Sequence, residues 1–161
     1  MKKLNKKGFT LVELLAVIVV LALLMVVATS SIGGALNNSK KNALKTEAQK
    51  MLTSVYQEVK SEIMLDSSIY SGETPKYILK NDGTDYQGAF KIAENKIVDY
   101  CILYKNGNTT KFSIGKSGAN ITFDDSDTST GFSIGNVSVK EGANVCTITE
   151  TSGVVSAITI K

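Results

Sequence analysis

The stretch at residues 9–28, FTLVELLAVIVVLALLMVVA, decides the architecture of this 161-residue chain. Only Thr10 and Glu13 within it are polar. Twenty residues of helix rise about 30 Å, which matches the hydrocarbon thickness of a bilayer. The preceding residues, MKKLNKKG, contain four lysines. Because basic residues beside a membrane span stay in the cytoplasm, we expect a single-pass protein with its C-terminal part outside.

The remainder of the chain is polar and offers few groups for catalysis. It has no histidine and no arginine, so it lacks the usual general base near neutral pH and a bidentate donor for phosphate or guanine. From Asp66 to the C-terminus nine lysines accompany eleven acidic residues, whereas nucleic-acid-binding domains usually have a basic face. We therefore predict a protein that is not an enzyme, has no cofactor and has no nucleic-acid partner.

Three interpretations of the N-terminus compete. A secretory signal peptide would be cut after the small residues at 26–28, and a plain membrane anchor would stay uncut. Neither interpretation accounts for Glu13, although an ionised side chain in a membrane helix costs about 2.5–3.5 kcal/mol or more. The third interpretation is a cut between Gly8 and Phe9. The new amino group of Phe9 would lie four residues from Glu13, in the same chain or in a neighbouring copy.

The residues around this cut carry a family resemblance. Residues 6–13, KKGFTLVE, resemble the prepilin processing motif of the type IV pilin family, and the likeness extends to Ala28. The resemblance implies that prepilin peptidase cuts after Gly8 and that Phe9 becomes the N-methylated first residue. It also implies that Glu13 neutralises the Phe9 amine while copies of the chain assemble with the pilus assembly machinery.

The apolar helix is predicted to continue as an amphipathic one. Many pilins have a proline about twenty residues into the mature helix, where this chain has Gly33-Gly34. This pair is either a soft point where the helix bends or melts on packing, or a pair of small residues at an interface. Apolar residues then recur at spacings of three and four, so we expect a helix to Leu65 that buries Val55, Val59 and Ile63.

From residue 71 the hydrophobic period changes to two, which predicts strands. We expect them at residues 77–80, 89–92, 97–105, 109–114, 130–140, 144–150 and 154–160. Asn106-Gly107-Asn108 predicts a hairpin with a type I′ turn, residues 115–118 read as a turn, and residues 141–144 read as a second hairpin loop. The predicted fold class is α+β, with the C-terminal half of the helix packed on one antiparallel sheet whose last three strands form a meander.

Cys101 and Cys146 alternate with apolar residues, so both are expected to face inward. Outside the membrane they would form a disulfide worth about 4 kcal/mol in the chain-entropy model, and the alternative is two buried free thiols. The acidic run at residues 124–127 does not fit an EF-hand loop, and we expect no metal site.

The predicted organisation is a leader at residues 1–8, a membrane or filament-core helix half at 9–30, an amphipathic half at 31–65 and an extracellular β-rich head at 66–161. The predicted function is a structural subunit of a type IV pilus-like surface filament, held first in the cytoplasmic membrane and then in the extracellular pilus. Three alternatives stay open: a minor pilin or pseudopilin of a secretion or DNA-uptake system, a non-assembling anchored binding module that keeps residues 1–8, and a secreted protein that starts near Thr29.

Overall fold

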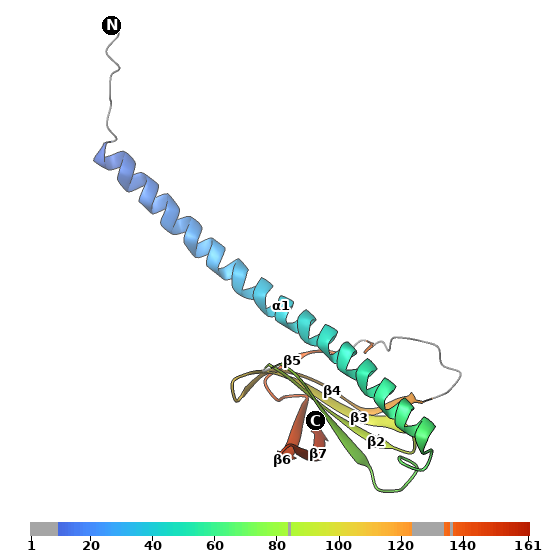
Figure 1. Ribbon diagram of the computed structural model, residues 1–161. Helices are drawn as coiled ribbons and strands as arrows, with labels where there is room; N and C mark the ends of the chain where they lie inside the picture. Colours follow the sequence, from blue (N-terminus) through green and yellow to red (C-terminus); the bar gives the residue numbers. More distant parts are fainter. Residues whose placement is uncertain (1–9, 84, 124–133, 136) are drawn as a thin grey trace. The chain divides into compact units, whose positions relative to one another are not determined.

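The computed structural model describes residues 10–83, 85–123, 134–135 and 137–161. Helix α1 runs from Leu11 to Leu65 (Figure 1), which confirms the long helix and its predicted end. The chain divides into two compact units, residues 1–40 and 41–161, and each is described by itself. In the first unit the backbone stays helical through Gly33 and Gly34. An added methyl group at either glycine would meet nothing within 4 Å.

In the second unit, α1 buries one apolar stripe. Its members recur at spacings of three and four, which keeps them on one side of the helix: Leu44, Ala48, Met51, Leu52, Val55, Tyr56 and Val59. Val55 and Val59 are fully buried as expected, and Ile63 is partly buried at the edge of the same core. Glu47 lies in the stripe and is only 8% exposed.

Five strands form the main sheet beneath this stripe. They are β1 (Lys76–Asp82), β2 (Tyr86–Ala93), β3 (Lys96–Asn106), β4 (Thr109–Thr122) and β5 (Lys140–Glu141), in the spatial order β1-β2-β3-β4-β5. Every neighbouring pair is antiparallel. A second sheet contains β6 (Cys146–Thr151) and β7 (Val154–Ile160). The predicted α+β class is therefore confirmed.

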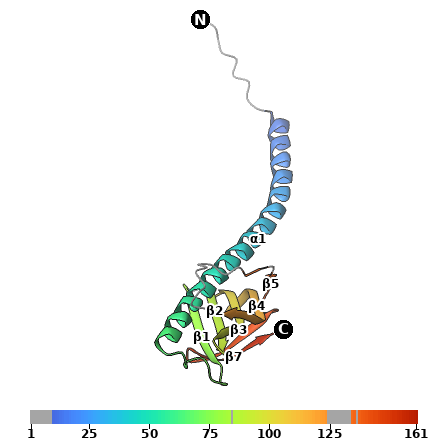
Figure 2. The same ribbon diagram turned by 90° about the vertical axis from the view of Figure 1, so that its right-hand side faces the viewer.

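The two faces of the main sheet pack against different partners. Side chains alternate between the two faces along a strand, so consecutive residues lie on opposite faces of the sheet. Phe90, Tyr100 and Ile102 belong to the core that contains the stripe of α1. Cys101 and Leu103 belong to a second cluster, with Cys146 and with isoleucines of β6 and β7. The main sheet thus lies between α1 and the β6–β7 hairpin, as Figure 2 shows from the side.

A disulfide joins these layers. Cys101 of β3 and Cys146 of β6 are both fully buried and bonded, with their Cα atoms 5.8 Å apart. The structure therefore has the disulfide and not the two free thiols. Gly115, opposite Cys101 on β4, leaves room for the bond, because a Cβ there would lie 2.7 Å from the Cys146 sulfur.

The predicted single sheet with a terminal meander is wrong. β5 pairs with β4, whereas β6 pairs only with β7, so residues 141–144 do not close a hairpin between paired strands. Of the predicted strand at 130–140, only Lys140 is in a strand within the described part. Alternation indicates which side chains point inward, but it does not indicate which of two faces a segment covers.

Two turn assignments also need correction. Residues 115–118 lie within β4 and not in a turn, because Asp99 of β3 accepts hydrogen bonds from the Ser117 hydroxyl at 2.9 Å and the Gly118 amide at 3.1 Å. The ladder between β3 and β4 shifts register beside Asp99. This shift forms a β-bulge, which accommodates the positive φ of Gly118. The β3–β4 hairpin is confirmed, but positive φ occurs at Gly107 and not at Asn108, as in a type II′ turn.

Candidate processing and assembly site

The N-terminus of α1 is closed by a reciprocal pair, Thr10 and Glu13. The Thr10 amide donates to Oε2 of Glu13 at 2.8 Å, and the Thr10 hydroxyl donates to the same oxygen at 2.9 Å. The Glu13 amide donates in return to the Thr10 hydroxyl oxygen at 3.3 Å. This is a capping box, with Thr10 at the N-cap and Glu13 at the third helical position.

The capping box gives Glu13 a role within its own chain. Its carboxylate lies in the first turn, where the helix macrodipole favours a negative charge. The ion pairs among the described residues are Lys50–Glu47, Lys80–Glu58 and Lys91–Asp99, so no described cation pairs with Glu13. Thr10 was not predicted as a partner of Glu13, although the Thr-x-x-Glu spacing before an apolar run is a recognisable signal of a capping box.

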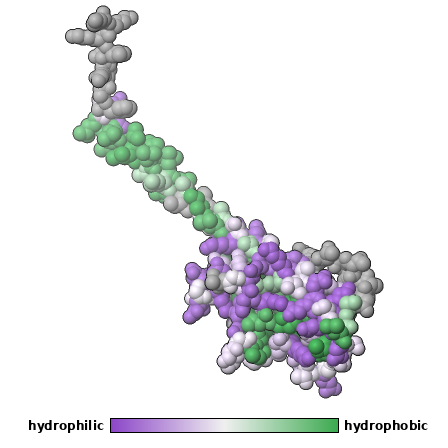
Figure 3. Space-filling model, in the orientation of Figure 1, coloured by the Kyte–Doolittle hydropathy of each residue, from purple (hydrophilic) through white to green (hydrophobic). Residues whose placement is uncertain are grey.

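An apolar surface follows the capping box. Large apolar side chains that follow Glu13 are at least half exposed, as at Leu14, Val17, Val20, Leu24 and Val27. This part of α1 is long and apolar enough to cross a membrane, and none of it is buried against other parts of the protein. Figure 3 shows this part of the helix as mostly hydrophobic on the side that faces the viewer. A contiguous surface of this kind marks contact with lipid or with another protein.

The cut residues themselves, Gly8 and Phe9, lie outside the described residues, as does the acidic run at 124–127. Among the residues that are described, His, Cys, Asp and Glu side chains form no group that could hold a metal ion. The described residues at this end of the chain supply the Glu13 carboxylate, the Thr10 hydroxyl and a long apolar helix face.

The N-terminal part of the chain combines three features: a basic leader, a capped carboxylate in the first helical turn and an exposed apolar helix. The family model for the prokaryotic N-terminal methylation motif matches residues 3–29, which contain all three features. The chain carries the leader signature of type IV prepilins. A search of curated proteins and a search of solved structures give no match to the chain.

The matched motif, which covers residues 3–29, indicates a type IV pilin-like precursor. Such precursors belong to a structural family, are processed by prepilin peptidase and self-assemble in general. The apolar helix agrees with a membrane-anchored precursor. The disulfide between Cys101 and Cys146 also fits a type IV pilin.

Proposed function

We propose that the protein is a structural subunit of a type IV pilus-like surface filament. Prepilin peptidase cuts the precursor between Gly8 and Phe9, the Phe9 amine is methylated, and the apolar helices of many copies then bundle. Before assembly the precursor spans the cytoplasmic membrane once, with its β-rich head outside. One observation supports this proposal: the matched motif includes a helix segment whose described large apolar side chains are exposed.

When the helix leaves the bilayer for a filament core, the polarity of the surroundings of its apolar side chains changes little. Lipid tails are as apolar as leucine, so the hydrophobic effect does not by itself favour one environment. Helix association then depends on close packing and on polar pairing. Glu13 is the polar group that distinguishes the two environments, because an unpaired charge there is costly.

The capping box leaves part of Glu13 available for this pairing. Both hydrogen bonds from Thr10 are accepted by Oε2, and Oε1 receives none from a described residue. After processing, the Phe9 amine adjoins Thr10, so it would reach Oε1 of its own chain or of a neighbour. Pairing with a neighbour would set the stagger between subunits.

The first test is the intact mass, with N-terminal fragmentation, of chain purified from membranes and from sheared surface material. We expect a chain that begins at Phe9 with one added methyl group in both fractions. A chain that keeps residues 1–8 beside an active prepilin peptidase would instead favour an anchored binding module. A start near Thr29 would indicate a secreted protein.

The second test separates assembly from processing. We expect Glu13→Ala to be cut at Gly8 like the wild type but to lose most of the filament recovered by shearing. Glu73→Ala removes an exposed carboxylate from the head and is the matched control. Abundant Glu13→Ala filaments would refute the role of Glu13. Correct processing with the chain scarce in wild-type filaments would favour a minor pilin or pseudopilin.

A further inference from the structure

The edge strand β1 lies along α1 through side chains two residues apart. Ile78 packs into the core, Lys80 forms an ion pair with Glu58, and Asp82 lies beside Glu47. β1 is the terminal strand of the main sheet, so β2 is its one ladder neighbour there. The attachment to α1 therefore contributes to holding the outer side of β1, which also contacts β7.

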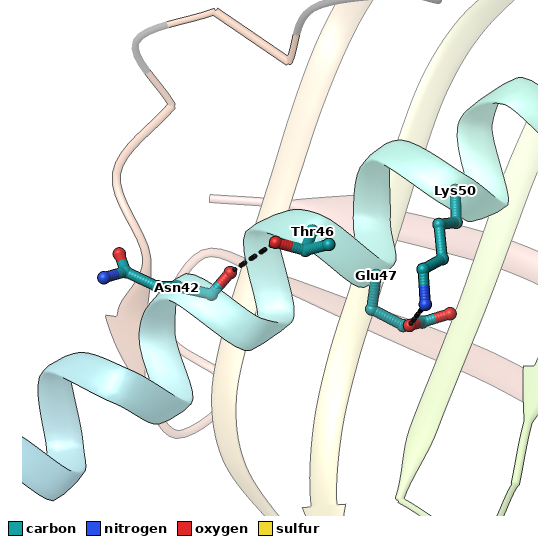
Figure 4. Close-up of polar contacts among 4 residues, drawn as sticks. All are labelled: Asn42, Thr46, Glu47 and Lys50. Carbon is teal, nitrogen blue, oxygen red and sulfur yellow. Dashed lines mark hydrogen bonds and ion pairs between the residues drawn. The ribbon is translucent and has the colours of Figure 1, made fainter.

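The last of these contacts joins two carboxyl groups. Glu47 is 8% exposed, and Asp82 lines the same pocket, where it raises the pKa of the Glu47 carboxyl group. Lys50, one helical turn along α1, places its ammonium nitrogen 3.1 Å from Oε2 of Glu47, as Figure 4 shows. A pocket of about 240 Å³ opens at this point and is lined by Glu47, Lys50, Met51, Ser54, Lys80, Asn81 and Asp82.

The charges around Glu47 do not balance when both carboxyl groups are ionised. From α1, Lys50 faces Glu47; from β1, Asp82 and Lys80 line the same pocket, and Lys80 already pairs with Glu58. From β2, the neutral Tyr86 phenol lies near, with Asp85 beside it. The ammonium group of Lys50 is thus left to neutralise two carboxylates, those of Glu47 and Asp82. Burial raises the pKa of Glu47, Asp82 raises it further, and Lys50 lowers it.

We propose that Glu47, Asp82 and Lys50 form a proton-operated latch between α1 and the end of edge strand β1. Protonated Glu47 donates a hydrogen bond to the Asp82 carboxylate, and this bond fastens the strand. When Glu47 ionises, the two carboxylates repel each other across the pocket and the end of β1 loosens. The proton resides on Glu47 because it is the buried partner, whereas Asp82 is exposed to water.

The direction of the pH effect follows from linkage. A carboxyl group with a raised pKa in the fastened state binds its proton more tightly there than in the loosened state. Its stabilising effect is complete below the ordinary value of 4.5 and is lost as the pH rises through the raised value. The latch therefore fastens as the pH falls and loosens as the pH rises through the raised pKa of Glu47.

Hydrogen exchange of the full-length protein in detergent micelles tests this latch. Protection factors of peptides covering β1 are measured from pH 5 to 8, corrected for the intrinsic rate and referred to β3. We expect wild-type protection of β1 to fall as the pH rises, by up to about tenfold for each pKa unit between the two states. Glu47→Gln should give a flat profile, because its amide donates to Asp82 at every pH.

Two further variants keep the test decisive. Asp82→Asn changes an exposed residue and removes the repulsion, so its profile should also be flat, even if Glu47→Gln does not fold. Glu58→Gln breaks the neighbouring ion pair on the same two elements, so it should lower β1 protection even at the lowest pH, where the latch is fastened. A flat wild-type profile, or a wild-type slope in either latch variant, would overturn the proposal.

Discussion

Removing the disulfide with the double change Cys101→Ala and Cys146→Ala should release the β6–β7 hairpin before the rest of the head. The hairpin has no ladder to the main sheet. Its buried contact with that sheet is a small cluster of Cys101, Leu103 and Cys146, with three partly buried isoleucines around it. An isolated two-stranded hairpin is marginally stable in water, so the covalent bond should contribute strongly to holding it against the main sheet.

The expected magnitude follows from the length of chain that the bond closes. The two cysteines are 45 residues apart, which corresponds to about 4 kcal/mol of unfolding free energy in the chain-entropy model. For a head of this size, such a loss should lower the melting temperature by on the order of 10–20 °C. The core between α1 and the main sheet does not contain the disulfide, so it should survive the change.

The assay is hydrogen exchange with thermal unfolding, on the full-length protein in detergent micelles. Peptides from β6 and β7 should lose protection in the double variant, whereas peptides from β2 and β3 should keep most of theirs. A reducing agent should reproduce this pattern in the wild type and should leave the double variant unchanged, which controls for its direct effects. Equal protection of the hairpin with and without the bond would refute the reasoning.

Three further predictions concern packing and capping. Gly115→Ala should destabilise the head by about 1–3 kcal/mol, because the new methyl group would lie 2.7 Å from a disulfide sulfur, whereas Gly72→Ala meets nothing within 4 Å and should be near neutral in denaturant unfolding. Leu52→Ala should lower the free energy of unfolding by about 2–5 kcal/mol, since Leu52 is 2% exposed. Leu65→Ala should lower it by less than about 0.5 kcal/mol, since Leu65 is 89% exposed. Similar unfolding midpoints for the two variants would contradict this prediction. Thr10→Val should cost the helix about 0.5–2 kcal/mol and fray its first turn in micelles, as amide exchange would detect, whereas Thr10→Ser should retain the cap.

Some features of the site were readable because they depend on residues close together in the chain. The leader, Gly8, Phe9 and Glu13 lie within a few residues of one another, and the apolar run is continuous. The capping box is equally local, because Thr10 and Glu13 are three residues apart. It was not predicted, because Glu13 was assigned only an ion pair with the Phe9 amine. The buried position of Glu47 was not readable, since its partner Asp82 is on a different element and comes 35 residues later.

The amino-acid sequence by itself determined the long helix, its buried stripe, most of the strands and the inward-facing cysteines, because each depends on a local period or on neighbouring residues. The tertiary structure alone decided that β5 joins β4, and that β6 and β7 cover the opposite face of the main sheet. Burial of apolar surface is non-directional, so an alternating strand can satisfy it against either face. The disulfide, the space at Gly115 and the ladder pairings selected one of these arrangements.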